Sequence, residues 1–166
     1  IFPAAHAEEL ILIENQSQAS SARQLIRWLQ QEDPSRIQDR LERALIQYET
    51  QSNFSGLLID ASSVAEFDLA TVPNIRDSEG SIVYPNPQTS YDDIIDKRGV
   101  SYDFDINDAI RNERVAVKPF IVKAVSIYKQ LTSDLVISSE DAKRITGSDS
   151  TRAAMNKAGV LIVVGI

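Results

Sequence analysis

The sequence has no cysteine and a single histidine, His6, and these two shortages argue against several kinds of chemistry. Without cysteine, the chain contains no disulfide, thiolate nucleophile, thiolate-ligated metal or lipid-modified cysteine. A Ser-His-Asp triad needs a histidine beside its nucleophile, and a zinc site commonly uses several histidines. The sequence therefore predicts neither a triad hydrolase nor a zinc enzyme.

Long apolar runs and nucleotide-binding loops are missing as well. The longest continuous apolar run is Val160–Val164, far short of the ~18–20 residues of a membrane span. Neither G-x-x-x-x-G-K-[ST] nor G-x-G-x-x-G occurs. The net charge is −7, whereas nucleic-acid binding needs clustered lysine and arginine. We therefore expect no nucleic-acid partner, no transmembrane segment in these residues and no nucleotide bound by such loops.

What is present fits one domain with a real core, because 43% of the 166 residues are hydrophobic and 25% are charged. The charge is uneven: residues 53–113 carry twelve acids and four bases, and residues 114–166 carry four acids and eight bases. An acidic middle and a basic end can attract each other within the fold or between subunits. A homo-oligomer is one prediction, and an unevenly charged solvated surface explains the pattern equally well.

The first seven residues read like the end of a secretory signal. Ala5-His6-Ala7 places small residues at the −3 and −1 positions of a cleavage site before Glu8. We therefore interpret residues 1–7 as a signal-peptide remnant and expect an exported protein.

Two helical patterns follow, over about residues 17–51. Ala22, Leu25, Ile26 and Leu29 recur at helical spacing, with three serines, Ser17, Ser20 and Ser21, available as caps. Asp33-Pro34 then opens a second helix whose apolar stripe is Ile37, Leu41, Ala44, Leu45 and Tyr48. The short turn predicts a helical hairpin or an angled pair. Trp28 lies beside the first stripe, in a packing role or in an exposed recognition role.

From about residue 55 to residue 166 the pattern changes to short strands and short helices. Asp77–Gly80 reads as a tight hairpin turn, and Asp105–Glu113 as a short helix capped by Asp105. Ser138 begins a capping box that starts another short helix, and this helix ends near Gly147. These elements predict an α/β (or α+β) fold, a small mixed sheet preceded by an N-terminal pair of helices. Residues 8–166 then form a single α/β domain.

Five motifs in this region resemble a known family. They are S-G-L-L-I-D-A at Ser55–Ala61, P-x-I-x-D-x-x-G-x-x-V-Y at Pro73–Tyr84, P-F-I-V-K-A at Pro119–Ala124, D-L-V-I-S-S-E-D-A at Asp134–Ala142, and the closing strand Val160–Val164. In this order they resemble the C-terminal domain of bacterial outer-membrane lipoproteins and flagellum-associated envelope proteins. The resemblance covers about residues 55–166 and implies an exported accessory protein. The family it resembles has no catalytic residues that could be assigned to positions of this sequence.

An acidic stretch supplies the candidate ligand and metal sites. Asp103, Asp105, Asn107 and Asp108 place oxygens close together, as a Ca²⁺ ion requires, although the EF-hand glycine and glutamate are missing. A strand end followed by a helix cap explains the same residues. Three aromatic residues nearby, Tyr84, Tyr91 and Tyr102, could line a groove for a peptide or glycan, or could pack in the core.

Two further carboxylates, Asp60 and Asp77, offer a general acid and base, although a strand end and a turn account for both. The leading hypothesis is therefore a non-catalytic envelope protein, periplasmic or associated with the outer membrane, that binds other surface or flagellar proteins. The alternative is a periplasmic domain that binds a small ligand or Ca²⁺ through the acidic middle. No cofactor other than Ca²⁺ is predicted.

Overall fold

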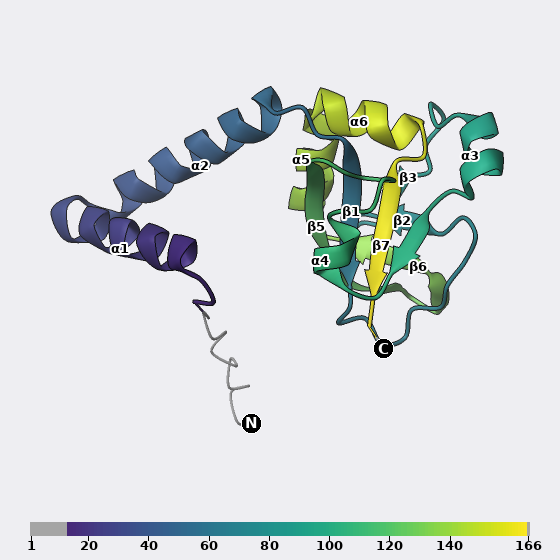
Figure 1. Cartoon of the computed structure of the whole chain (residues 1–166), viewed down its shortest axis with the longest axis horizontal. Coiled ribbons are helices and arrows are strands. Elements are labelled where there is room, and N and C mark those ends of the chain that lie inside the picture. The colour runs from purple at the N-terminus through teal and green to yellow at the C-terminus, as the bar shows by residue number, and fades with distance from the viewer. Residues whose placement is uncertain (1–12, 166) are drawn as a thin grey trace. The chain divides into compact units, whose positions relative to one another are not determined.

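The computed structural model describes residues 13–165, which divide into two compact units between Ile46 and Gln47 (Figure 1). The first unit contains helix α1 (Gln16–Gln31) and most of helix α2 (Pro34–Gln51). The second contains the last turn of α2, a mixed sheet and four short helices. The predicted α/β class, with a pair of helices before the sheet, is confirmed. The signal-peptide remnant predicted at residues 1–7 lies outside the described residues.

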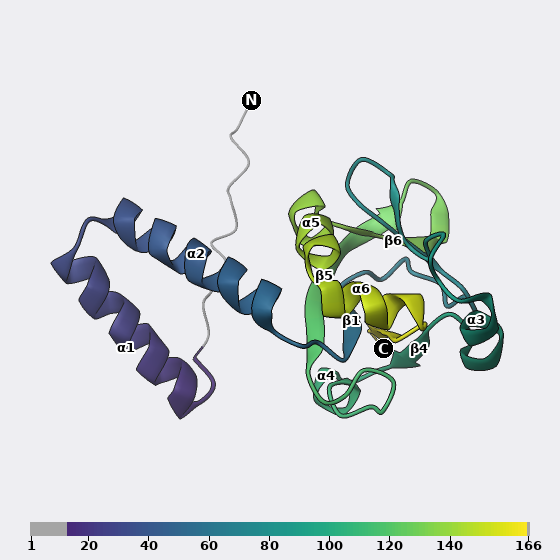
Figure 2. The same ribbon diagram turned by 90° about the horizontal axis from the view of Figure 1, so that it is seen from above.

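The two N-terminal helices meet at the short turn between Gln31 and Pro34 and diverge from it as an angled pair, called the helical hairpin below (Figure 1 and Figure 2). The cap of α1 differs from the prediction: the Asn15 side chain accepts a hydrogen bond from the Gln18 backbone N–H at 2.9 Å, and the serines are helical. Asparagine caps as well as serine because its short side chain reaches the free N–H groups of the first turn. Asp33 caps α2 as predicted, accepting from the Ser35 N–H at 2.9 Å.

The strands between residues 13 and 165 form one seven-stranded sheet in the order β3-β2-β6-β5-β1-β7-β4. The four strands β5, β1, β7 and β4 run parallel to one another. Strand β6 is antiparallel to β5, β2 is parallel to β6, and β3 is antiparallel to β2. Their bounds are β1 Gly56–Ala61, β2 Asn74–Arg76, β3 Ile82–Tyr84, β4 Ser101–Asp103, β5 Pro119–Tyr128, β6 Leu131–Ile137 and β7 Val160–Val164.

The sheet curls until its two ends approach each other. Strands β3 and β4 stand at opposite ends of the strand order, yet the Tyr84 hydroxyl in β3 donates a hydrogen bond to the carbonyl of Gly99, two residues before β4. The loop after β1 also reaches β4, because the Tyr102 hydroxyl donates to the Ala70 carbonyl at 2.6 Å. Curling encloses one face of the sheet, and that face carries the larger core.

Strand β1 shows how the two faces are filled. Leu57, Ile59 and Ala61 point into the larger core, which also contains Ile145 and Met155 of the covering helices α5 (Ser139–Gly147) and α6 (Asp149–Asn156). Alternate residues of a strand face opposite sides, so Leu58 points to the other face. There it packs in a smaller cluster with residues of α4 (Ile106–Ala109).

The turn and helix caps of the second unit are formed by short-range hydrogen bonds. The Asp77 carboxylate accepts from the backbone N–H groups of Glu79 (3.0 Å) and Ser81 (2.9 Å), so the predicted β2–β3 turn is confirmed. Gly80 has φ +93°, a conformation that favours glycine. Ser138 caps α5 as predicted. The helix predicted at Asp105–Glu113 is wrong in length, since α4 spans only Ile106–Ala109 and hydrogen-bonded turns follow.

None of the helices described between residues 13 and 165 is long and apolar enough to cross a membrane. The remaining helix described in this unit is α3 (Tyr91–Lys97). Ser90 caps its start, and Lys97 in its last turn forms an ion pair with Asp93 at 2.7 Å.

Candidate functional site

The three tyrosines predicted to bind a ligand lie in different environments. Tyr84 is fully buried, and burial raises the pKa of its hydroxyl to about 12, although Arg114 opposes the shift. Tyr102 is half-buried, and burial raises its pKa as well, against a hydrogen bond to Ala70. Tyr91 begins α3 with 75% of its surface exposed. Of the three, Tyr91 and Tyr102 therefore have surface that a ligand could contact, whereas Tyr84 packs in the core.

In the predicted Ca²⁺ site, one oxygen of each carboxylate forms a local hydrogen bond or ion pair. Asp103 accepts from the Phe104 N–H at 2.8 Å, and Asp105 accepts from the N–H groups of Asn107 (2.7 Å) and Asp108 (3.2 Å). Asp108 forms an exposed ion pair with Arg111 at 2.8 Å. Among residues 13–165 no cluster of three or more acidic or histidine side chains is placed to hold a metal ion. Ca²⁺ binding stays a prediction without a contact in its favour.

The carboxylates considered as an acid–base pair are each engaged in local hydrogen bonds. Asp60, in β1, accepts from the Ser62 backbone N–H at 3.0 Å and from the Ser62 hydroxyl at 2.6 Å. Asp77, directly after β2, accepts from the backbone N–H groups of Glu79 and Ser81. Strands β6 and β5 lie between β2 and β1 in the sheet. The strand end and the turn therefore account for the two carboxylates, and the hydrolase hypothesis gains no contact in its favour.

The first unit instead presents an apolar surface. A groove of about 180 Å³ lies between the two helices, lined by Trp28 of α1 and by Ile37, Arg40, Leu41 and Ala44 of α2. Ile37 is buried, whereas helix α1 contains no buried residue among those described. Several large apolar side chains of the hairpin keep much of their surface in water: Ile26 (53%), Leu29 (44%), Leu41 (42%) and Leu45 (50%). Apolar surface of this kind on an exposed element marks interaction sites in soluble proteins.

The amphipathic spacing of the sequence explains why this surface exists. Each helix has one apolar stripe, and two stripes of this width can cover each other only in part when only two helices pack. The polar side is solvated: Arg40 forms an ion pair with Glu32 at 2.8 Å, with 64% and 40% of the two side chains exposed. The hairpin is therefore a two-helix element whose apolar stripes stay partly exposed, and the groove beside Trp28 is part of that exposed apolar surface.

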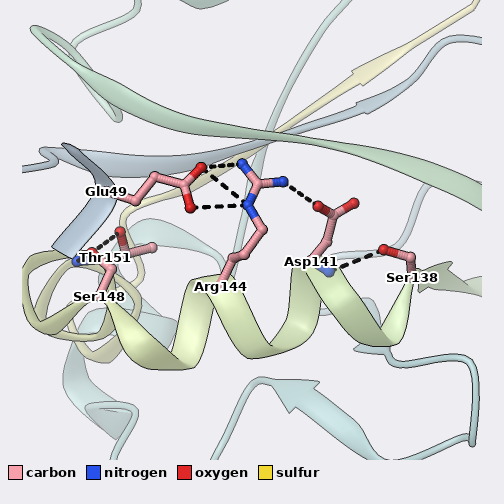
Figure 3. A network of polar contacts seen from close by, with 6 residues as sticks. All are labelled: Glu49, Ser138, Asp141, Arg144, Ser148 and Thr151. Carbon is pink, nitrogen blue, oxygen red and sulfur yellow. Dashed lines mark hydrogen bonds and ion pairs between the residues drawn. The ribbon is translucent and has the colours of Figure 1, made fainter. Parts of the chain in front are cut away.

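A buried ion pair fixes the last turn of α2 within the second unit. Glu49 is 7% exposed and accepts from Arg144 Nε of α5 through both carboxylate oxygens at 3.0 Å (Figure 3). Arg144 also contacts Asp141 in its own helix and lies 5.2 Å from the centre of the Phe120 ring. The hydrogen bonds that Arg144 donates to the Glu49 carboxylate raise the pKa of Arg144. This network makes the end of α2 part of the α/β unit.

Sequence reasoning did not identify Glu49, although a clue was present. Ile37, Leu41 and Leu45 recur every four residues, and Glu49 is the next position in that series. A carboxylate at an apolar position of a helix face is almost never buried without a partner. The partner is 95 positions away, and no local pattern identifies it.

The second unit is the part that compares with known proteins. A family model described as the second domain of Treponema pallidum Tp0624 matches residues 56–165, about two-thirds of the chain. The chain belongs to this family. No curated protein matches the sequence.

The boundaries of the Tp0624 second-domain match coincide with the fold. The match begins at Gly56, the first residue of β1, and ends at Gly165, directly after β7. It therefore contains the whole sheet with α3, α4, α5 and α6, and the helical hairpin precedes it. The Tp0624 family is bacterial, as expected from the motifs of Ser55–Val164.

Proposed function

We propose that this chain is a non-catalytic accessory module of the bacterial envelope. In this proposal the Tp0624-type domain is a structural scaffold, and the helical hairpin binds another envelope protein. One observation carries the binding role: the hairpin exposes large apolar side chains in both helices beside a groove of about 180 Å³. That volume suits one large apolar side chain of a partner, as in recognition of an amphipathic helix.

The envelope location rests on the sequence. The signal-like residues 1–7 and the five motifs that resemble outer-membrane lipoprotein and flagellum-associated domains favour an exported product. A structural or assembly role also agrees with the local hydrogen bonds that engage Asp60 and Asp77 and with the single histidine. A protein partner in the periplasm or at the outer membrane is the expected ligand.

Fractionation of the native host, combined with a surface variant, tests both parts of the proposal. The variant Ile26→Gln, Leu29→Gln, Leu45→Gln removes exposed apolar area from the hairpin. The matched control Arg23→Gln, Asp39→Asn, Glu42→Gln alters the same number of exposed positions. We expect the wild type and the control to copurify with the same envelope protein, and the apolar variant to bind it about tenfold more weakly or not at all.

Two results would contradict the proposal. Recovery of the native full-length product from the cytosol alone would remove the envelope location. Equal copurification by the apolar variant and the wild type, with helicity retained in far-UV circular dichroism, would remove the hairpin as the binding element.

A further inference from the structure

A cavity of about 420 Å³ lies at the amino ends of the parallel strands, on the side of the domain where β1, β7 and β4 begin. Ser55 and Gly159 directly precede β1 and β7, and Ser101 is the first residue of β4. The remaining wall comes from the turn at residues 112–114 and from the end of α6 with Lys157. Cavities of this size hold small-molecule ligands.

The charge of this cavity is opposite to that of the chain. The cations Lys97, Arg114 and Lys157 line it and face one acid, Glu113, in a protein whose net charge is −7. Lys97 has a counter-ion, Asp93, at 2.7 Å. Neither Arg114 nor Lys157 forms an ion pair with any acid of residues 13–165. Two cations at the cavity therefore have no ion pair of their own, and both share the field of the Asp93 carboxylate, which is paired with Lys97.

Arg114 is the more constrained of the two. Its Nε donates to the Ala158 carbonyl at 2.7 Å and one Nη to the Arg98 carbonyl at 3.2 Å. These bonds fix the plane of the guanidinium and use two of its five N–H donors. Burial lowers the pKa of Arg114, while Tyr84 and Asp93 act in the opposite direction. A half-buried cation that has lost water and has no carboxylate within ion-pair distance is stabilised by an anion that enters.

We propose that this cavity binds a small molecule through a phosphate group, held between the free edge of the Arg114 guanidinium and the Lys157 ammonium. A guanidinium presents parallel N–H groups that match two oxygens of a phosphate. A dianion balances both unpaired cations, whereas a single carboxylate would balance one. The Ser101 hydroxyl, also on the wall, is a further donor.

The rest of the ligand has a place beside the phosphate. An adjoining hollow of about 490 Å³ shares Lys97 and Ser101 with the cavity and adds the apolar or aromatic surfaces of Leu69 and Tyr102. An apolar or ring-containing body bonded to the phosphate would contact this surface. Tyr102, predicted from the sequence as a ligand-contact residue, would then meet the body and not the phosphate.

Calorimetric titration with inorganic phosphate and with phenyl phosphate tests the site on the whole chain in low-salt buffer. We expect a dissociation constant of about 1 mM or lower for inorganic phosphate, and tighter binding of phenyl phosphate. Lys157→Gln, at an exposed position, should weaken binding about fivefold and Arg114→Gln about tenfold. Lys123→Gln, an exposed lysine of β5 outside the cavity, is the matched control and should bind as the wild type does.

The Lys157 variant keeps the test valid if loss of Arg114 disturbs folding, because Lys157 donates no side-chain hydrogen bond within residues 13–165. Absence of phosphate binding by the folded wild type would overturn the proposal. Equal binding by the wild type, Lys157→Gln and Lys123→Gln would do the same, since the anion would then bind elsewhere. Each result is independent of partner binding by the hairpin.

Discussion

Arg144 of α5 holds the carboxylate of Glu49, which is 95 positions earlier in the chain and 7% exposed. Both oxygens of Glu49 accept from the guanidinium, and the Phe120 ring lies against it. The pair ties the last turn of α2 to the sheet domain within the second unit.

Removing Arg144 should destabilise the second unit strongly, because Glu49 would keep its burial and lose its counter-ion. We expect Arg144→Ala to lower the free energy of unfolding by about 2–4 kcal/mol in urea titrations. Arg152→Ala is the matched control in the next helix, since its pair with Asp149 is exposed (50% and 90%) and should contribute less than about 1 kcal/mol. Equal losses in the two variants would show that the Glu49 pair is not a buried anchor.

Gly56, at the start of the matched region, should tolerate no side chain. A Cβ there would lie 2.6 Å from the Val115 Cα, and this contact is with backbone that cannot move aside cheaply. We expect Gly56→Ala to cost about 2–3 kcal/mol in unfolding free energy. Gly147→Ala is the control, because no atom lies within 4 Å of its added Cβ. A Gly56→Ala protein as stable as Gly147→Ala would mean that strand β1 and the Val115 turn are not packed this closely.

The stability of the protein should fall at high pH because of Tyr84. Burial raises the pKa of its hydroxyl from 10.0 to about 12, so the folded state holds this proton more tightly than the unfolded state does. The stabilisation is fully present below pH 10 and is lost as the pH rises toward 12, a loss of about 2 kcal/mol.

Urea unfolding at a series of alkaline pH values checks this dependence. Tyr84→Phe should be less stable near neutral pH, because the Gly99 carbonyl loses its donor, and should depend less steeply on pH above about 10. The matched control Tyr91→Phe changes an exposed ring and should retain the wild-type slope. If the unfolding free energy of Tyr84→Phe fell with pH as steeply as that of the wild type, the pH dependence would come from other groups.

Much of the second unit was predictable because its signals are local. Asp77 with Gly80 specifies a tight turn, and Ser138 specifies the start of α5, through hydrogen bonds that span two to four residues. Gly56 and Asp60 bound an apolar run that becomes the central strand β1. The class of fold and most of its elements follow from such short-range rules.

The arrangement in space was not predictable in the same way. Strand order, the curl that brings Tyr84 to Gly99, and the pairing of Glu49 with Arg144 all depend on residues far apart in the chain. The cationic cavity is a similar case, because Lys97, Arg114 and Lys157 come from three separate segments. The apolar stripes of the helices were visible in the sequence, but not how much of each stripe stays exposed.

Site-specific photo-crosslinking in the native host tests the proposed role of the hairpin most directly. A photoreactive residue at Leu45 samples the apolar side of α2, and the same residue at Asp39 samples an exposed polar position of that helix. We expect Leu45 to form a discrete crosslink to one envelope protein and Asp39 to form none. Crosslinking of equal yield from both positions, or none from Leu45 in the correctly folded protein, would contradict a binding role for this surface.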